Sequence, residues 1–398
     1  LRYKSGASAG RLAHTGSQGD HRVNVLQVRP ALAAAVAALA LVACSGKPAA
    51  DRAAPAEEKI LNVYNWSDYI EPTVLEAFTK ETGIKVNYDV FDSNEMLDTK
   101  MLAGNTGYDI VVPSAAFLYR QNKAGVYSKL DRQQLSNLGN VDPEIAGRIS
   151  KAFDANNEHS VNYMWGTSGV GYNVKKIKER MPNAPVDSFA MFYDPKVVSK
   201  FADCGVTLLD APSEVVGTVL IYLGKDANSE NPEDLAAAEK VLQSVRKYIR
   251  NFNSSAYIEG LANGNVCLAL GWSGDVLQAK TRAESAKNGV EVSYNIPKEG
   301  AVMFFDQFAI PKDAKHPKNA HLFINYMLRP DVAAKNSSFI QYANGNSASK
   351  SLIDASVTGN PNVYPSDELM KKLVPDLPES PDFNRLLTRS WTRVKTGQ

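Results

Sequence analysis

Short runs rich in β-branched and aromatic residues alternate with amphipathic helical segments along most of this 398-residue chain. The first helical candidate begins near Pro72 and stops at Gly83, and the clearest one spans Pro232–Ile249. The strand candidates are Ile60–Trp66, Ile84–Val90, Tyr108–Val112, Val206–Leu209, Val266–Gly271, Glu291–Ile296 and Phe304–Ile310. Because strands that alternate with helices pack as layers around a sheet, we expect an α/β protein.

The chain is longer than one ordinary hydrophobic core supports, so two lobes are expected. We place lobe 1 at residues 60–164 plus 290–342, and lobe 2 at residues 165–289 plus 343–398. A chain that crosses between lobes more than once leaves a cleft between them. Such clefts suit ligand binding with hinge closure.

The first part of the chain has the features of an export signal. Ala31–Ala43 is an apolar run that is too short to span a bilayer but suits the hydrophobic region of a signal peptide. It leads into Cys44 in the sequence LVACS, which resembles the lipidation motif of bacterial lipoproteins; a plain secretory signal is the alternative. We therefore expect a signal peptide at residues 1–43, a lipid-modified Cys44 and a flexible tether over residues 44–59.

Two further cysteines, Cys204 and Cys267, lie beyond the export segment. In an oxidising compartment such a pair is expected to form a disulfide, with two buried free thiols as the alternative. Closing the 63-residue loop between them would stabilise the fold by roughly 4 kcal/mol, because it lowers the chain entropy of the unfolded state.

Composition and motifs argue against several classes of function. Lysine plus arginine (44) nearly balance aspartate plus glutamate (43), and no basic stripe indicates a nucleic-acid binder. The sequence has no zinc-protease, paired-cysteine, phosphate-loop or serine-hydrolase motif, and we interpret the glycine-rich stretch Gly166–Gly171 as a backbone crossover. Carboxylates are numerous enough to leave an exported glycan-processing enzyme as an alternative. We favour binding without catalysis, and we expect no cofactor and no metal.

Polar and aromatic residues form six clusters, several of them just past strand ends, where open α/β sheets bind ligands. The clusters lie at residues 64–69, 112–114, 209–214, 271–275, 304–308 and 341–344. Asp306 is the most informative residue, because it lies within the apolar run Met303–Ile310 and no neighbouring lysine or arginine offers a partner. The clusters together suggest aromatic walls with carboxylates at intervals. A diamine needs this arrangement, since its ammonium groups donate to carboxylates while its methylenes lie on aromatic rings.

Each of the other residues has a structural alternative. Ser114 and Asp275 could cap the helices that follow them. Trp66 and Trp272 could be core aromatics, which is the commoner place for tryptophan, and Glu214 could lie on the surface beside a proline turn. These alternatives stay open at the level of the residues alone.

The runs YNWSDYI, VVPSA, YMWGT, LDAP, GWSGDV, YNIPKEG and RPDV are spread along the chain between Ile60 and Lys395. In these runs the chain closely resembles the spermidine/putrescine substrate-binding family of bacterial polyamine ABC importers. The resemblance implies a two-lobe periplasmic binding protein of type II with a hinge between the lobes, and an ABC permease in the inner membrane as its partner. The two cysteines also match this family, which supports their pairing. We further expect a monomer in the periplasm that has no nucleic-acid partner.

Carried over position by position, the resemblance implies ten ligand contacts: Trp66, Ser67, Asp68, Ser114, Glu214, Trp272, Asp275, Phe304, Asp306 and Tyr342. Asp275 would take one ammonium group and Asp306 would lie near the other side of the pocket. The aromatic contacts would line the methylenes. Phe304 favours putrescine as the ligand. Spermidine, or another cation received or sensed by the same fold, is the alternative.

Overall fold

The computed structural model describes residues 57–398, and its centre is a mixed β-sheet. The strands are β1 (Ile60–Trp66), β2 (Lys85–Phe91), β3 (Ile110–Val111), β4 (Ser160–Asn173), β5 (Val206–Leu208), β6 (Asn251–Phe252), β7 (Leu268–Trp272), β8 (Val292–Asn295), β9 (Ala301–Ala309), β10 (Ala343–Asn344) and β11 (Leu373–Pro375). They are joined in the order β2-β1-β3-β9-β4-β7-β5-β6, with β8 and β10 beside β4 and β11 beside β9. The expected α/β class is therefore confirmed.

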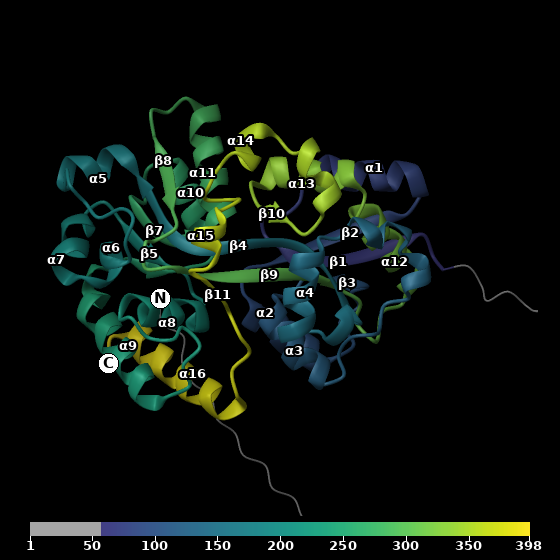
Figure 1. Cartoon of the computed structure of the whole chain (residues 1–398), viewed down its shortest axis with the longest axis horizontal. Coiled ribbons are helices and arrows are strands. Elements are labelled where there is room, and N and C mark those ends of the chain that lie inside the picture. The colour runs from purple at the N-terminus through teal and green to yellow at the C-terminus, as the bar shows by residue number, and fades with distance from the viewer. Residues whose placement is uncertain (1–56) are drawn as a thin grey trace, which may run out of the picture. The chain divides into compact units, whose positions relative to one another are not determined.

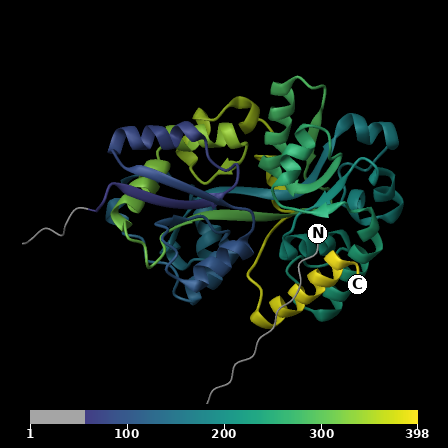
Figure 2. The same cartoon turned by 180° about the vertical axis from the view of Figure 1, so that it is seen from behind.

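Helices cover the sheet in both halves of the described chain (Figure 1). They are α1 (Pro72–Thr82), α2 (Asn94–Ala103), α3 (Ala115–Lys123), α4 (Pro143–Ala152), α5 (Val174–Arg180), α6 (Ala190–Tyr193), α7 (Pro195–Val198), α8 (Pro212–Tyr222), α9 (Pro232–Val245), α10 (Ala256–Ala262), α11 (Ser273–Ala286), α12 (Pro317–Met327), α13 (Pro330–Ile340), α14 (Ala355–Thr358), α15 (Asp367–Met370) and α16 (Pro381–Thr396). The C-terminal α16 lies beside α9 in both views (Figures 1 and 2).

The long strand β4 connects two groups of strands, because it changes partners along its length. Ser160–Thr167 pairs antiparallel with β9, in the group that contains β1, β2 and β3. Ser168–Tyr172 pairs antiparallel with β7, in the group that contains β5 and β6. Figure 1 shows β4 and β9 running through the middle of the described chain between these groups. The lobe boundaries expected from the sequence stay a prediction.

All seven expected strands are present, and their ends differ by a few residues at most. The stretch Gly166–Gly171, interpreted as a backbone crossover, is part of β4, and β4 passes from one group of strands to the other within it. Glycine is needed there for close packing: a Cβ on Gly169 would lie 2.7 Å from the carbonyl oxygen of Asn295, and one on Gly171 2.6 Å from Val276 Cγ2. In a strand, glycine often marks such a close approach.

The two clearest helices begin where the sequence predicts. Helix α1 starts at Pro72 and ends at Gly83, whose φ of 71° is the left-handed conformation that glycine adopts without strain. Helix α9 starts at Pro232 but ends at Val245, four residues before the predicted end. Arg246–Tyr248 continues as a 3-10 turn.

The predicted disulfide between Cys204 and Cys267 is present, with an S–S distance of 1.99 Å and a Cα–Cα distance of 5.5 Å. It joins the segment that leads into β5 to the residue before β7. Because β5 and β7 are neighbouring parallel strands, the bond fixes the start of this pair.

The expected signal peptide (residues 1–43), the lipid-modified Cys44 and most of the tether (44–59) lie outside the described residues. Within residues 57–398, no helix combines the length and apolar character needed to cross a bilayer.

Candidate functional site

A cavity lies where the two groups of strands meet, and residues from both groups form its walls. Its lining is Trp66, Ser67, Tyr69, Phe91, Asp92, Asn94, Ser114, Glu214, Ser254, Ser255, Ile258, Trp272, Asp275, Phe304, Asp306 and Tyr342. Nine of the ten contacts expected from the sequence are among these residues; the exception is Asp68. Segments more than 200 residues apart in the chain therefore meet at one site.

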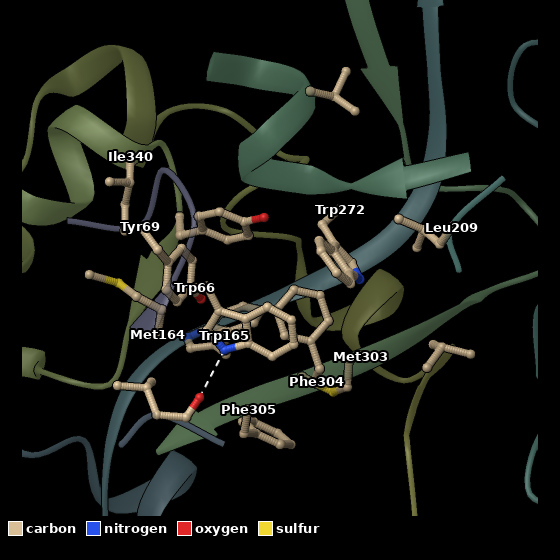
Figure 3. Close-up of a cluster of buried hydrophobic side chains, with 14 of the residues drawn as sticks. Trp66, Tyr69, Met164, Trp165, Leu209, Trp272, Met303, Phe304, Phe305 and Ile340 are labelled. Atoms are coloured by element: carbon tan, nitrogen blue, oxygen red, sulfur yellow. Dashed lines mark hydrogen bonds between the residues drawn. The ribbon is translucent and has the colours of Figure 1, made fainter. Parts of the chain in front are cut away.

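Aromatic side chains form the walls of the cavity. The rings of Trp66 and Trp272 meet edge to face with centroids 5.4 Å apart, and Phe304 lies 6.2 Å from Trp272 and from Tyr342. The indole Nε1 of Trp66 donates to the carbonyl oxygen of Val112 at 2.9 Å, which fixes the ring (Figure 3). Both tryptophans are 8% exposed, so they are largely buried as the structural alternative holds, but they also form part of the cavity wall.

Asp306 is buried in the cavity wall with part of its hydrogen-bonding capacity unused. It lies on β9 two residues after Phe304, so both side chains point to the same face of the strand. Tyr69 donates its hydroxyl to Oδ2 of Asp306 at 2.7 Å. Within residues 57–398, Oδ1 has no hydrogen-bond partner although it is buried. Burial raises the pKa of Asp306 well above its ordinary value, although the bond from Tyr69 opposes this.

Ser114 faces Asp306 across an antiparallel bridge between the two backbones. Ser114 does precede α3 at the capping position, but its hydroxyl makes no capping bond. Its Oγ has no partner in the described part of the chain. The capping alternative for Ser114 is therefore wrong, and two bridged residues of the cavity lining, Ser114 and Asp306, each have a buried oxygen without a partner in the described residues.

Asp275 lies in the first turn of α11, where both of its carboxylate oxygens accept hydrogen bonds from tyrosines. Tyr342 donates to Oδ1 at 2.7 Å and Tyr257 donates to Oδ2 at 2.8 Å. The helix begins at Ser273, and the carboxylate accepts no helix N–H group, so the capping alternative for Asp275 is also wrong. Burial raises its pKa to about 7, and the two tyrosine bonds oppose that shift.

Glu214 supplies a third buried carboxylate from the first turn of α8. Its Oε2 accepts hydrogen bonds from Ser168 Oγ at 2.6 Å and from Trp272 Nε1 at 2.8 Å. Glu214 is 6% exposed, so the surface alternative is wrong, and burial raises its pKa. None of the residues that line this cavity is a lysine or an arginine. The site therefore has three desolvated carboxyl groups and no protein cation in its walls, an arrangement that favours a cationic ligand.

Asp68 lies beside the cavity and not in its lining. Its backbone is left-handed (φ 55°), and its carboxylate accepts from Arg282 Nη2 of α11 at 2.6 Å. Its carboxylate is therefore already paired with a protein cation. The neighbouring Ser67 does line the cavity, and its hydroxyl donates to Asp92 at 2.7 Å.

Seven lining residues were not predicted from the sequence: Tyr69, Phe91, Asp92, Asn94, Ser254, Ser255 and Ile258. Tyr69 belongs to a cluster that was recognised, and its place in an aromatic and acidic run was a usable signal. Ser254, Ser255 and Ile258 carry no such signal. They lie in the turn into α10 and in its first turns, and the fold brings this segment to the cavity.

Comparisons with known proteins agree with this fold. A family model described as bacterial extracellular solute-binding protein matches residues 73–365. The putrescine-binding periplasmic protein SpuD of Pseudomonas aeruginosa is 50% identical over 352 residues, which cover 88% of this chain and 95% of that protein. The putrescine-binding periplasmic protein PotF of Escherichia coli is 51% identical over 345 residues, covering 86% and 93%. A solved structure of a putative spermidine/putrescine ABC transporter from Listeria monocytogenes matches with a TM-score of 0.77 at 30% identity, covering 85% of this chain and 100% of that one.

The similarity extends over most of the chain. The two-lobe, type II fold of periplasmic binding proteins is confirmed, as is the expectation of a binding protein in place of an enzyme. The chain belongs to the family of bacterial extracellular solute-binding proteins.

Proposed function

We propose that this protein captures putrescine in the cavity and delivers it to the permease of an ABC importer. The observation that carries the proposal is the buried Oδ1 of Asp306, which has no hydrogen-bond partner among the described residues; Ser114, bridged to Asp306 through the backbone, has an Oγ that also lacks one. A buried carboxylate oxygen without a donor costs free energy, and an ammonium group would remove that cost. The names of the relatives at 50% and 51% identity support the same ligand.

A short diamine suits both the charges and the walls of the site. One ammonium group would donate to Asp306 and Ser114, and Asp275 or Glu214 would accept from the other. The methylenes would lie against Trp66, Trp272 and the other rings of the wall. Charge-assisted hydrogen bonds contribute about 1.5–3 kcal/mol each and cation–π contacts about 0.5–2 kcal/mol, which permits micromolar or tighter binding after the costs of association.

The proposal also includes a cellular location and a membrane anchor. The protein would work in the periplasm as a monomer, anchored to a membrane by lipid on Cys44. The anchor rests on the sequence LVACS around that residue. A tether over residues 44–59 would leave the binding lobes free to reach the permease.

Melting-temperature measurements test the ligand directly. Putrescine is expected to raise the melting temperature, because a ligand present at about 100 times its Kd and bound only to the native state adds about 2.7 kcal/mol of stability. The screen includes spermidine, amino acids and oligosaccharides. A larger shift with spermidine would replace putrescine as the ligand. Turnover of an oligosaccharide, or no shift with any polyamine, would contradict the proposed function.

The ion pair between Asp68 and Arg282 is expected to help hold the lobes closed over the ligand. The two side chains are 40% and 37% exposed, so the contribution is small, about 0.2–1 kcal/mol. Arg282→Ala should therefore raise the Kd for putrescine by no more than about fivefold, mainly through faster dissociation, and less at high salt. Calorimetry and stopped-flow dissociation measure this. The matched control is Lys280→Ala on the same helix, which should leave the Kd unchanged. Within residues 57–398 the ammonium group of Lys280 pairs only with Glu284, at 3.9 Å.

A further inference from the structure

Tyr257 is a buried residue that touches the binding site without lining the cavity. It lies in α10 with 1% of its surface exposed. Its hydroxyl donates to Oδ2 of Asp275 at 2.8 Å and accepts from the backbone N–H of Trp272 at 3.0 Å. One phenol therefore fixes both a carboxylate and the backbone at the end of β7.

Tyr342 makes the matching pair of contacts on the other oxygen. Its hydroxyl donates to Oδ1 of Asp275 at 2.7 Å and accepts from the N–H of the same residue at 3.2 Å. Each oxygen of Asp275 thus has its own tyrosine donor, and each tyrosine hydroxyl is held by a backbone N–H. The orientation of this carboxylate is determined from two sides. Asp306, by contrast, has one tyrosine donor.

Two glycines leave the space that the tyrosines occupy. A Cβ on Gly271 would lie 2.6 Å from Cε2 of Tyr257, and a Cβ on Gly274 would lie 2.2 Å from Cδ2 of Tyr342. Real Cβ atoms do not approach other atoms this closely, so the rings could not lie where they do beside any larger residue. Glycine at positions 271 and 274 therefore leaves room for the two phenol rings that hold the carboxylate of Asp275.

We propose that Tyr257 is a positioning residue for ligand capture: it holds the carboxylate of Asp275 in the orientation that accepts an ammonium group, and it does not itself touch the ligand. This inference rests on the proposed function. The alternative is that Tyr257 only fills the space between α10 and α11. The two differ in a testable way, because filling space needs the ring and positioning needs the hydroxyl.

The variant Tyr257→Phe separates these roles, since it keeps the ring against Gly271 and removes only the hydroxyl. The Kd for putrescine is expected to rise about tenfold. The matched control is Tyr193→Phe, because Tyr193 is 2% exposed and its hydroxyl bonds Thr218 Oγ1 at 2.6 Å, away from the cavity. The control loses a comparable buried hydrogen bond and should keep the wild-type Kd within twofold. Equal Kd values for the two variants would overturn the proposal.

Two further measurements separate positioning from general damage and from failure of the proposed function. In the Asp275→Asn background, Tyr257→Phe should raise the Kd by much less than in the wild type. The same fold increase in Kd in both backgrounds would contradict the inference.

The second measurement is a ¹³C NMR titration of the Asp275 carboxyl group in the empty protein, which needs no ligand. The titratable groups that interact with this carboxyl are Tyr257, Tyr342, Tyr69, Asp68, Asp306 and Arg282, and loss of the Tyr257 donor should raise its pKa. If the wild type bound no diamine, this titration would still test the role of Tyr257. An unchanged pKa of Asp275 in the Tyr257→Phe variant would rule out the positioning role.

Discussion

Replacing Asp306 with asparagine is expected to weaken putrescine binding at least thirtyfold and, at the same time, to stabilise the empty protein at neutral pH. The two effects have one cause. Asp306 is 3% exposed, its Oδ1 has no partner within residues 57–398, and its pKa is raised well above the ordinary value. Folding the empty protein therefore costs free energy at this residue, either to bury the charge or to take up a proton. Binding recovers that cost, and removing one partner of a buried charge pair loses about 2–5 kcal/mol of affinity.

Calorimetry gives the loss of affinity, and thermal unfolding without ligand gives the stability. Asparagine has the size of aspartate and can still accept the hydrogen bond from Tyr69, so the variant should fold. Asp109→Asn is the matched control, because Asp109 is also buried but accepts from Asn62 N, His316 N and His316 Nδ1. It should lower the stability and leave the Kd unchanged. A destabilised Asp306→Asn protein with wild-type affinity would show that Asp306 is a structural residue.

The fold could be predicted from the sequence wherever local pattern and tertiary packing agree. Ile60–Trp66 is a strand with the predicted ends, and α1 begins at Pro72 and ends at Gly83 as predicted. The longest strand, β4, was missed because the glycines of Gly166–Gly171 have low strand propensity. The need for glycine there comes from distant residues: a Cβ on Gly166 would lie 2.8 Å from Phe304 Cζ. A single sequence does not show which distant side chains will approach a glycine.

The same limit applies to the site. Asp306 could be singled out from the sequence, because a carboxylate within an apolar run has few structural explanations. Asp275 and Ser114 could be ligand contacts or helix caps by sequence alone, and only their hydrogen bonds exclude capping. Tyr257 had no signal at all. It lies in an ordinary amphipathic stretch, and its role depends on the distance from its hydroxyl to Asp275, which the packing of α10 against α11 sets.

Putrescine affinity is expected to fall about thirtyfold between pH 8 and pH 5.5, while the empty protein changes stability in the opposite direction. Burial raises the pKa of Asp275 from 3.8 to about 7 in the empty protein, and an ammonium group beside it would lower that pKa again in the complex. Between about pH 4 and pH 7, binding therefore releases a proton from Asp275. Each pH unit below 7 then costs up to about tenfold in affinity, and above pH 7 the effect levels off.

The stability of the empty protein changes with pH in the opposite direction to the affinity. Between about pH 4 and pH 7, Asp275 holds a proton in the native state but not in the unfolded state. Stability from Asp275 should fall as the pH rises from about 4 to 7 and stay level above. Calorimetry at pH 6 in two buffers of different ionisation enthalpy counts the protons released on binding. Asp275→Asn should release fewer protons and show a flatter pH profile of its Kd, because Asp306 and Glu214 remain as the groups whose pKa is raised by burial. A wild-type Kd that stays constant within twofold from pH 8 to pH 5.5 would mean that binding releases no proton, and it would contradict an ammonium group beside Asp275.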